Sequence, residues 1–390
     1  MSQRVGLVAA LMVGLATGTP AAAQEGQVPR VKLSKPEASF PEPFSSIAGL
    51  RELPEGRVVV SDRLEIALRI VDLNAGTVEE IGHEGGGPGE YRMPGDLLWL
   101  PGDSTLLVDF GNMRLTTIAP DGTLGGSLGM MHPEGFMLFP RGTDAEGRLY
   151  FDRSNVMSMQ PGESLPDSFA VVSLDRGTGV IDTIAMLPRP EVARVTSGGG
   201  GFAFSGSGVL PFESANDWAV ARDGRVALAW GDDYRLEWRS RGGGGVVGPV
   251  VAYEPVEITR ADKEAWADRM SSASVSVVST GGGSGRSRAF SMPRPDIDAL
   301  DWPEVKPPFG RSAVSVTPEG EAWVRRYVAA GDPETYDVFD AAARRVRQVV
   351  LPSDRRLVGF GRGVLYAVYV DGDDLQWLER YGISNIDQGR

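Results

Sequence analysis

Short apolar runs follow turns rich in acidic residues and glycine at six places along this chain. Each turn contains a glycine, the residue that adopts positive φ without strain, and each apolar run has the length of one strand. The copies lie at residues 54–60, 101–108, 146–151, 223–228, 319–324 and 361–366. A turn and strand that recur at long period are typical of a radial array of small β-sheets.

Further hairpins are predicted behind these strands. After the first copy, apolar residues 66–73 and 77–81 flank the turn Asn74-Ala75-Gly76, and similar pairs flank Asp-containing turns near residues 121, 175 and 340. Asn or Asp with Gly suits tight hairpin turns. Each repeat therefore predicts an antiparallel sheet of four strands.

The spacing of the repeats predicts six blades of a β-propeller. The marker glycines 56, 102, 147, 224, 320 and 363 are separated by 46, 45, 77, 96 and 43 residues, and a blade needs about 40–50. The two long steps indicate insertions. Residues 188–211 form a glycine-rich loop in this interpretation, whereas residues 259–308 open with a capping box, Thr259 to Asp262, ahead of a short helix. A seventh blade in the second insertion is the alternative, but residues 271–308 lack the repeated turn and strand.

The last blade, residues 355–383, is one strand short. Residues 28–33 precede the first blade and could supply that strand. We therefore predict a single all-β domain over residues 24–390, a six-bladed propeller whose ring is closed by the N-terminal strand. A closed ring would remove the exposed sheet edges that favour aggregation.

The first 23 residues have the pattern of a secretory signal peptide. Arg4 precedes the apolar residues 5–16, and Ala21 to Ala23 end in a small-residue cleavage site, with cleavage expected after Ala23. The apolar run is shorter than the ~20 residues of a membrane span, so a retained anchor helix is the less favoured alternative. We expect a secreted or periplasmic protein with no membrane span after cleavage.

Composition excludes several classes of protein. The chain has no cysteine, so disulfides, thiolate metal sites and lipoprotein attachment are excluded. Its net charge is −13, and loss of Arg4 with the signal peptide makes it −14, which disfavours nucleic acid and anionic membranes as partners. We expect a monomer whose partner is another protein or a small-molecule ligand.

The connector after the first blade carries a family resemblance. Residues 81–91 read Ile-Gly-His-Glu-Gly-Gly-Gly-Pro-Gly-Glu-Tyr, and residues 109–114 read Asp-Phe-Gly-Asn-Met-Arg. This combination resembles the secreted bacterial six-bladed propellers of the NHL-like type, over most of residues 28–385. The resemblance implies the fold more than an activity.

Most motifs that could carry chemistry have a structural interpretation. The Gly-rich residues 82–89 precede a strand and lack a Lys, so they predict a connector, in which Glu84 and Glu90 accept backbone N–H groups, and not a phosphate loop. Residues 371–374 predict a hairpin turn rather than a calcium loop. The arginine clusters at 325–326 and 344–347 are expected on solvated strand faces, with pairing to acidic residues as the alternative.

The sequence offers few residues for nucleophilic catalysis. Only two histidines exist, His83 and His132, and a Ser-His-acid hydrolase would need one of them beside a nucleophile. Two histidines cannot form a three-histidine zinc site.

The residues that enter the innermost strands are the best candidates for a site, because they line one mouth of the propeller channel. They are Asp96, His132, Asn216, Asp217 and Arg311. Asp, Asn and His side chains there could hold Ca²⁺ or another divalent cation, as in propeller lactonases and lyases, or could instead bind ordered water.

We predict a secreted binding module for a protein or a small ligand, with no catalysis and no obligatory cofactor. The alternatives are a metal-dependent hydrolase or lyase acting at the channel mouth, and a structural module of an envelope complex. Presence of a stoichiometric metal would favour the enzyme.

Overall fold

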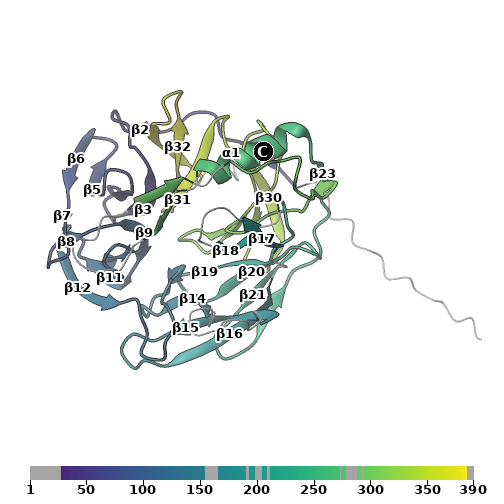
Figure 1. Cartoon of the computed structure of the whole chain (residues 1–390). Helices are drawn as coiled ribbons and strands as arrows, with labels where there is room; N and C mark the ends of the chain where they lie inside the picture. The colour runs from purple at the N-terminus through teal and green to yellow at the C-terminus, as the bar shows by residue number, and fades with distance from the viewer. Residues whose placement is uncertain are drawn as a thin grey trace, which may run out of the picture.

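The structure is a computed structural model, and it describes residues 28–153, 166–189, 193–197, 204–208, 211–272, 274–277, 288–291 and 294–383. The predicted signal peptide and its cleavage site lie outside these residues. Six small antiparallel sheets are arranged around a central axis (Figure 1). The predicted six-bladed β-propeller is confirmed.

Each blade runs from an innermost strand to the outer rim in chain order. Blade one contains β3 (Ile47–Glu52), β4 (Val58–Asp62), β5 (Ala67–Asp72) and β6 (Thr77–Glu80). Blade two contains β9 (Pro94–Trp99), β10 (Thr105–Asp109), β11 (Arg114–Ile118) and β12 (Leu124–Gly129). Blade three contains β13 (Gly142–Thr143), β14 (Leu149–Arg153), β15 (Ser168–Leu174) and β16 (Ile181–Pro188).

The other three blades repeat this plan. Blade four contains β19 (Asp217–Val220), β20 (Val226–Trp230), β21 (Arg235–Arg239) and β22 (Gly245–Val247). Blade five contains β27 (Val314–Val316), β28 (Ala322–Arg325), β29 (Thr335–Phe339) and β30 (Arg345–Val350). Blade six contains β31 (Arg355–Gly361), β32 (Val364–Val370) and β33 (Gln376–Gly382).

The core lies between neighbouring blades, and this explains why the strand after each marker glycine is apolar without interruption. In β4, Val58 and Val60 pack in one apolar cluster with Tyr366 of blade six, whereas Val59 packs in another with Leu107 of blade two. Because successive side chains point to opposite faces of a strand, a blade between two others is buried on both faces. A continuous apolar run is the expected pattern for such a strand.

The segment that closes the ring is not the one predicted. Residues 28–33 do not complete the last blade: β1 (Arg30–Lys32) instead pairs in parallel with β30 on the rim of blade five. The fourth strand of blade six is β2 (Ala38–Ser39), antiparallel to β33. Phe40 and Phe44 follow β2 and are buried against blades one and six. The N-terminal part of the chain does close the ring, but ten residues later than the apolar pattern indicated, because two buried aromatic residues anchor that segment.

The insertions contain more regular structure than a loop. In the first, β17 (Ala193–Ser197) and β18 (Phe204–Gly208) pair as a hairpin, which corrects the predicted glycine-rich loop; residues 198–203 lie outside the described part. β-Branched Val195 and Thr196 favour the extended conformation. The second insertion contains α1 (Arg260–Ser272) and two strand pairs, β23 (Val256–Glu257) with β26 (Val305–Lys306) and β24 (Ser274–Val277) with β25 (Arg288–Ser291). These elements do not form a seventh four-stranded blade in the described residues.

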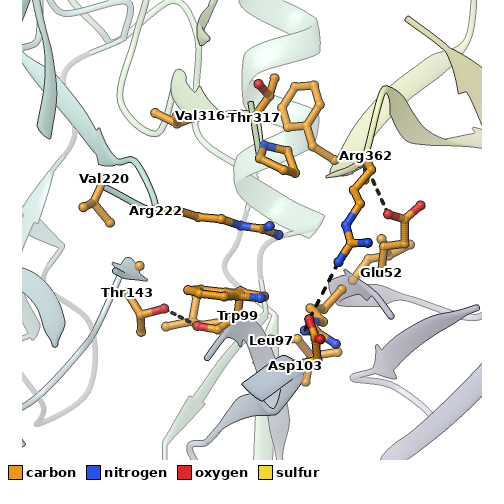
Figure 2. Close-up of a pocket in the computed structure, with 17 residues that line it drawn as sticks. Glu52, Leu97, Trp99, Asp103, Thr143, Val220, Arg222, Val316, Thr317 and Arg362 are labelled. Atoms are coloured by element: carbon orange, nitrogen blue, oxygen red, sulfur yellow. Dashed lines mark hydrogen bonds and ion pairs between the residues drawn. The ribbon is translucent and has the colours of Figure 1, made fainter. Parts of the chain in front are cut away.

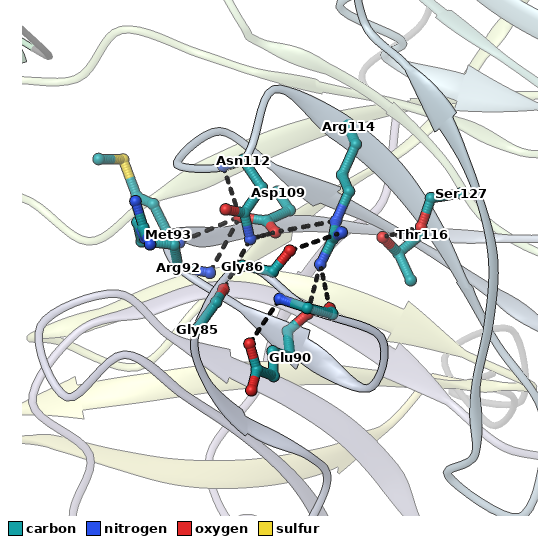
Figure 3. A network of polar contacts seen from close by, with 11 residues as sticks. Gly85, Gly86, Glu90, Arg92, Met93, Asp109, Asn112, Arg114, Thr116 and Ser127 are labelled. Carbon is teal, nitrogen blue, oxygen red and sulfur yellow. Dashed lines mark hydrogen bonds and ion pairs between the residues drawn. The ribbon is translucent and has the colours of Figure 1, made fainter. Parts of the chain in front are cut away.

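The Gly-rich connector is held by the side chains of the motif that follows it. Asp109 accepts backbone N–H groups of Arg92, Met93 and Asn112, while Asn112 donates to the Gly85 carbonyl at 2.9 Å (Figure 3). Arg114 donates to the carbonyl oxygens of residues 87 and 90.

These contacts give the connector a structural role. Glu90 accepts the Gly87 N–H, as predicted. The connector forms the parallel pair β7 (His83–Glu84) and β8 (Glu90–Tyr91), and no helix follows it. The interpretation of residues 82–89 as a connector, and not a phosphate loop, is confirmed.

Two further expectations are settled by the structure. Asp371 accepts the N–H groups of Asp373 and Leu375 in the turn between β32 and β33, so residues 371–374 are the predicted hairpin turn. The arginine clusters, by contrast, include side chains that are nearly buried: Arg326 and Arg345 both face the carboxylate of Asp337. The expectation of solvated faces is wrong for these two residues, and pairing with acidic residues holds. Among the described helices, none has the length and apolar character needed to cross a membrane.

The capping box of α1 is formed, and it is tied to a buried lysine. Asp262 accepts the N–H and hydroxyl of Thr259 at 2.9 and 2.6 Å, the Lys306 Nζ at 2.6 Å and the Ala330 N–H at 2.7 Å. Desolvation acts to raise the pKa of Asp262, but the hydrogen bonds outweigh it and hold the pKa at about 2. The carboxylate therefore locks the insertion against blade five.

This arrangement predicts an acid-dependent loss of stability. Because the pKa of Asp262 is lower in the folded protein than its ordinary 3.8, its contribution is complete above about pH 4 and is lost as the pH falls toward 2. We expect Asp262→Asn to lower the melting temperature at pH 6, by an amount equivalent to about 2 kcal/mol. The difference from the unsubstituted protein should shrink between pH 4 and pH 2 in thermal scans; a constant difference would contradict the prediction.

Candidate functional site

The channel has two mouths, which we name after the innermost strands. At the strand-start mouth these strands begin, and the site residues were predicted for this mouth. Asp217 is nearly buried, and both of its oxygens are used: Oδ1 accepts from Arg141 Nη2 at 2.6 Å and Oδ2 accepts the Val314 N–H at 2.8 Å. Asp217 thus joins the innermost strands of blades three, four and five.

Two more carboxylates lie around Arg141. Asp152 accepts from the Trp218 indole at 2.5 Å and is 3.9 Å from Arg141 Nη1. Asp96 reaches solvent, but desolvation by the surrounding protein raises the pKa of its carboxyl against the opposing charges of Arg63 and Arg141. Arg141 therefore pairs with Asp217, and its charge also acts on Asp96.

The remaining predicted residues have separate contacts. Asn216 Oδ1 accepts the Gly231 N–H at 3.2 Å. Arg311 is half-exposed and lies 3.9 Å from the Glu213 carboxylate. His132 stacks on Phe136 with ring centroids 4.4 Å apart, and its Nδ1 accepts the Glu134 N–H at 3.3 Å. None of these contacts joins His132 to the other four candidates.

A divalent cation at this mouth would meet oxygens that already have protein partners. The oxygens of Asn216 and Asp217 that would coordinate it already accept protein hydrogen bonds. No group of three His, Asp or Glu side chains with suitable geometry occurs in the described ranges. A cation at this mouth stays a prediction from the sequence that metal analysis would test.

The strand-end mouth holds a cavity of about 170 Å³. All six innermost strands contribute to its wall, and the turns behind them complete it (Figure 2). Its polar side chains come from Glu52, Asp103, Thr143 and Thr317, together with three arginines, Arg51, Arg222 and Arg362. Three guanidinium groups around one cavity make this mouth distinctive in an acidic protein.

Arg51, at the end of β3, is only 5% exposed. Its Nε and Nη1 have no hydrogen-bond partner among the described residues, and its Nη2 lies 3.6 Å from Asp103 Oδ1. Burial lowers the pKa of Arg51 to about 10; Asp103 opposes that shift, and the neighbouring charges of Arg222 and Arg362 add to it. A buried cation with unused donors and like charges beside it is unfavourable unless an anion joins it.

Arg222 is held by an aromatic ring. Its guanidinium lies over Trp99 with 4.7 Å between the guanidinium carbon and the ring centroid (Figure 2). Stacking uses the face of the guanidinium and leaves its N–H donors free at the edge. Burial and then the charge of Arg362 lower the pKa of Arg222, while Glu319, Asp103 and Glu52 oppose the shift.

Arg362 closes the third side of the cavity. Its Nη2 lies 3.8 Å from Asp103 Oδ1, the same oxygen that faces Arg51. Glu52 does not neutralise these guanidinium groups by direct hydrogen bonds: its oxygens accept the backbone N–H of Arg362 at 2.8 Å and the hydroxyl of Tyr366 at 2.9 Å. The arrangement can therefore hold an oxyanion between fixed donors.

The sequence interpretation placed its candidates at the opposite mouth. A signal for the strand-end mouth was present, because Arg51, Arg222 and Arg362 each stand within five residues before a marker glycine. Three of the six repeats thus carry an arginine at the end of the innermost strand. These three arginines meet only when the ring closes, and the positions of the repeats along the sequence do not predict which side chains meet.

No protein family matches the sequence, and no curated protein matches it either. Among solved structures, the chain is similar to a member of the DUF4221 family from Bacteroides vulgatus, with 11% identity, 90% of this chain and 98% of that chain covered, and a TM-score of 0.47. It is also similar to a gluconolactonase from Xanthomonas campestris, with 10% identity, 88% and 91% coverage and a TM-score of 0.42. A third is virginiamycin B lyase from Staphylococcus aureus, with 11% identity, 88% and 98% coverage and a TM-score of 0.39. Similarities at this level decide neither the NHL-like type nor an activity.

Proposed function

We propose that this protein is a binding module that holds a small anionic ligand at the strand-end mouth of its channel. The observation that carries the proposal is Arg51, a buried guanidinium with two nitrogens that lack acceptors in the described structure. Arg222 and Arg362 lie beside it and repel it. The predicted signal peptide supports a location outside the cytoplasm.

Physical chemistry favours an oxyanion at this position. The planar guanidinium fork matches carboxylates and phosphates, which accept two parallel hydrogen bonds. Inside a partly enclosed cavity such bonds are stronger than in water, because the surrounding medium is less polar. Binding of an anion would also relieve repulsion among the three arginines.

The test compares the response of two arginine variants to anions. Sulfate, phosphate and malonate, added at constant ionic strength, are expected to raise the melting temperature of the unsubstituted protein. Arg51→Met should lose this response, while its own stability without anions stays equal or rises, because an unpaired buried cation has been removed. A structural arginine would instead lower stability on substitution.

Arg260→Met is the matched control, since the side chain of Arg260 is 71% exposed and lies on α1. It should respond to anions as the unsubstituted protein does. Equal anion responses in Arg51→Met and Arg260→Met would refute the proposal.

A second candidate function is a hydrolase or lyase acting at the strand-start mouth. The raised pKa of Asp96, close to the charge of Arg141, favours it, because a carboxyl that keeps its proton at higher pH suits a general acid. Lactone hydrolysis that is lost in Asp96→Asn, together with a stoichiometric metal by mass spectrometry, would support this activity. A metal-free protein without hydrolysis would exclude it.

A further inference from the structure

We infer that the ligand of the strand-end mouth is a small dicarboxylate, with one carboxylate bound by Arg51 and Arg362 and the other by Arg222. This inference rests on the proposed function. It adds the chemical class of the ligand and the division of its charges between two sides of the cavity.

The three arginines form two groups. Arg51 belongs to blade one and Arg362 to blade six, which are neighbours in the ring, and both face Asp103 Oδ1, at 3.6 and 3.8 Å. Arg222 follows the innermost strand of blade four, the blade opposite blade one. Figure 2 shows Arg222 extending over Trp99 toward the side of the cavity from which Arg362 comes. The two groups are rooted on opposite sides of the ring and reach into one cavity, so a ligand with two acceptor groups can meet both.

The protein positions Arg222 and Arg51, so a ligand would meet two prearranged donors. The Trp99 ring positions Arg222 through its face. Burial at the end of β3 positions Arg51. Asp103 holds the pair of Arg51 and Arg362 near each other, at distances too long for hydrogen bonds. A ligand carboxylate can therefore bind this pair without displacing a formed hydrogen bond.

The size of the cavity agrees with a compound of this class. A cavity of about 150 Å³ holds a benzene-sized molecule, so the 170 Å³ at this mouth has room for roughly six to ten non-hydrogen atoms by the same comparison. Dicarboxylates with three to five carbons fall in this range. Inorganic phosphate is smaller and offers a single acceptor centre.

The experiment is a calorimetric titration of the full mature protein at pH 7.5 and constant ionic strength. Malonate, succinate and glutarate are the dicarboxylate probes, acetate is the monocarboxylate, phosphate is the single-centre anion and malonamide is the neutral analogue. We expect the best dicarboxylate to bind at least ten-fold more tightly than acetate or phosphate, because a second charged hydrogen-bonding group contributes about ten-fold or more. Malonamide should not bind.

Two variants then test which arginines bind each carboxylate. Arg222→Gln should weaken the best dicarboxylate about ten-fold or more, to the affinity of acetate, and leave acetate unchanged. Arg51→Gln should weaken both. Thermal scans without anions check that each variant is folded, and Arg260→Gln serves as the exposed control.

Different outcomes would contradict the dicarboxylate inference and the proposed function. If phosphate binds more tightly than every dicarboxylate, or if Arg222→Gln weakens acetate and the dicarboxylates equally, the dicarboxylate inference is wrong while an anion site remains. If none of the anions binds and Arg51→Gln changes nothing, the proposed function itself is wrong.

Discussion

Deletion of residues 24–44 is expected to lower the melting temperature far more than deletion of residues 24–36. The longer deletion removes β2, which completes blade six, and it also removes Phe40 and Phe44, which are 3% and 1% exposed. Burial of two such side chains contributes about 3–6 kcal/mol. The shorter deletion removes β1, whose residues are exposed or half-exposed on the rim of blade five, and the partly buried Leu33.

Differential scanning calorimetry of the two truncated proteins measures this difference. Should the longer deletion prevent folding altogether, the double substitution Phe40→Ala with Phe44→Ala keeps the β2 backbone and removes only the anchors. It should still lose several kcal/mol. Equal melting temperatures for both truncations would mean that β2 does not close the ring.

Substitution of Asp337 by alanine is expected to have the second large effect. Asp337 is fully buried in β29 and accepts from Tyr234 Oη at 2.7 Å, Arg326 Nη1 at 2.9 Å and Gln348 Nε2 at 2.8 Å. Its loss would leave the nearly buried Arg326 without this counter-ion. Removal of one partner from a buried ion pair costs about 3–5 kcal/mol.

Urea unfolding of Asp337→Ala measures the change in the free energy of unfolding. The control is Asp268→Ala, since Asp268 and Arg294 form an ion pair at 2.7 Å with both side chains about half or more exposed. An exposed pair contributes about 1 kcal/mol or less. A loss for Asp337→Ala as small as for the control would show that the network around it is not required for stability.

Local patterns in the sequence were sufficient for the repeat itself. Apolar runs such as residues 58–60, with Gly56 before them, predict a strand and a turn because a strand and a tight turn each depend on a few neighbouring residues. The cap of α1 was predicted for the same reason, since Thr259 and Asp262 are three residues apart. The hairpin turn at residues 371–374 is a third example.

Such patterns do not predict contacts between residues that are far apart in the sequence. Phe40 and β33 are separated by the whole ring in sequence, and nothing near residues 28–40 indicates which segment pairs with the last blade. Arg326 and Arg345 were expected in solvent because arginine is usually exposed. They are nearly buried because both pair with Asp337, which also accepts the hydroxyl of Tyr234 from the preceding blade.

The sequence by itself determined the number of blades, most of the strands and turns within them, and the lack of cysteine chemistry. The tertiary structure decided that β2 closes the ring and that Arg51, Arg222 and Arg362 share one cavity at the other mouth. The physical reason is that hydrogen-bonded turns and strands are local, whereas the channel exists only when strands from all six blades meet around one axis. Desolvation and repulsion of those guanidinium groups arise only in that closed arrangement.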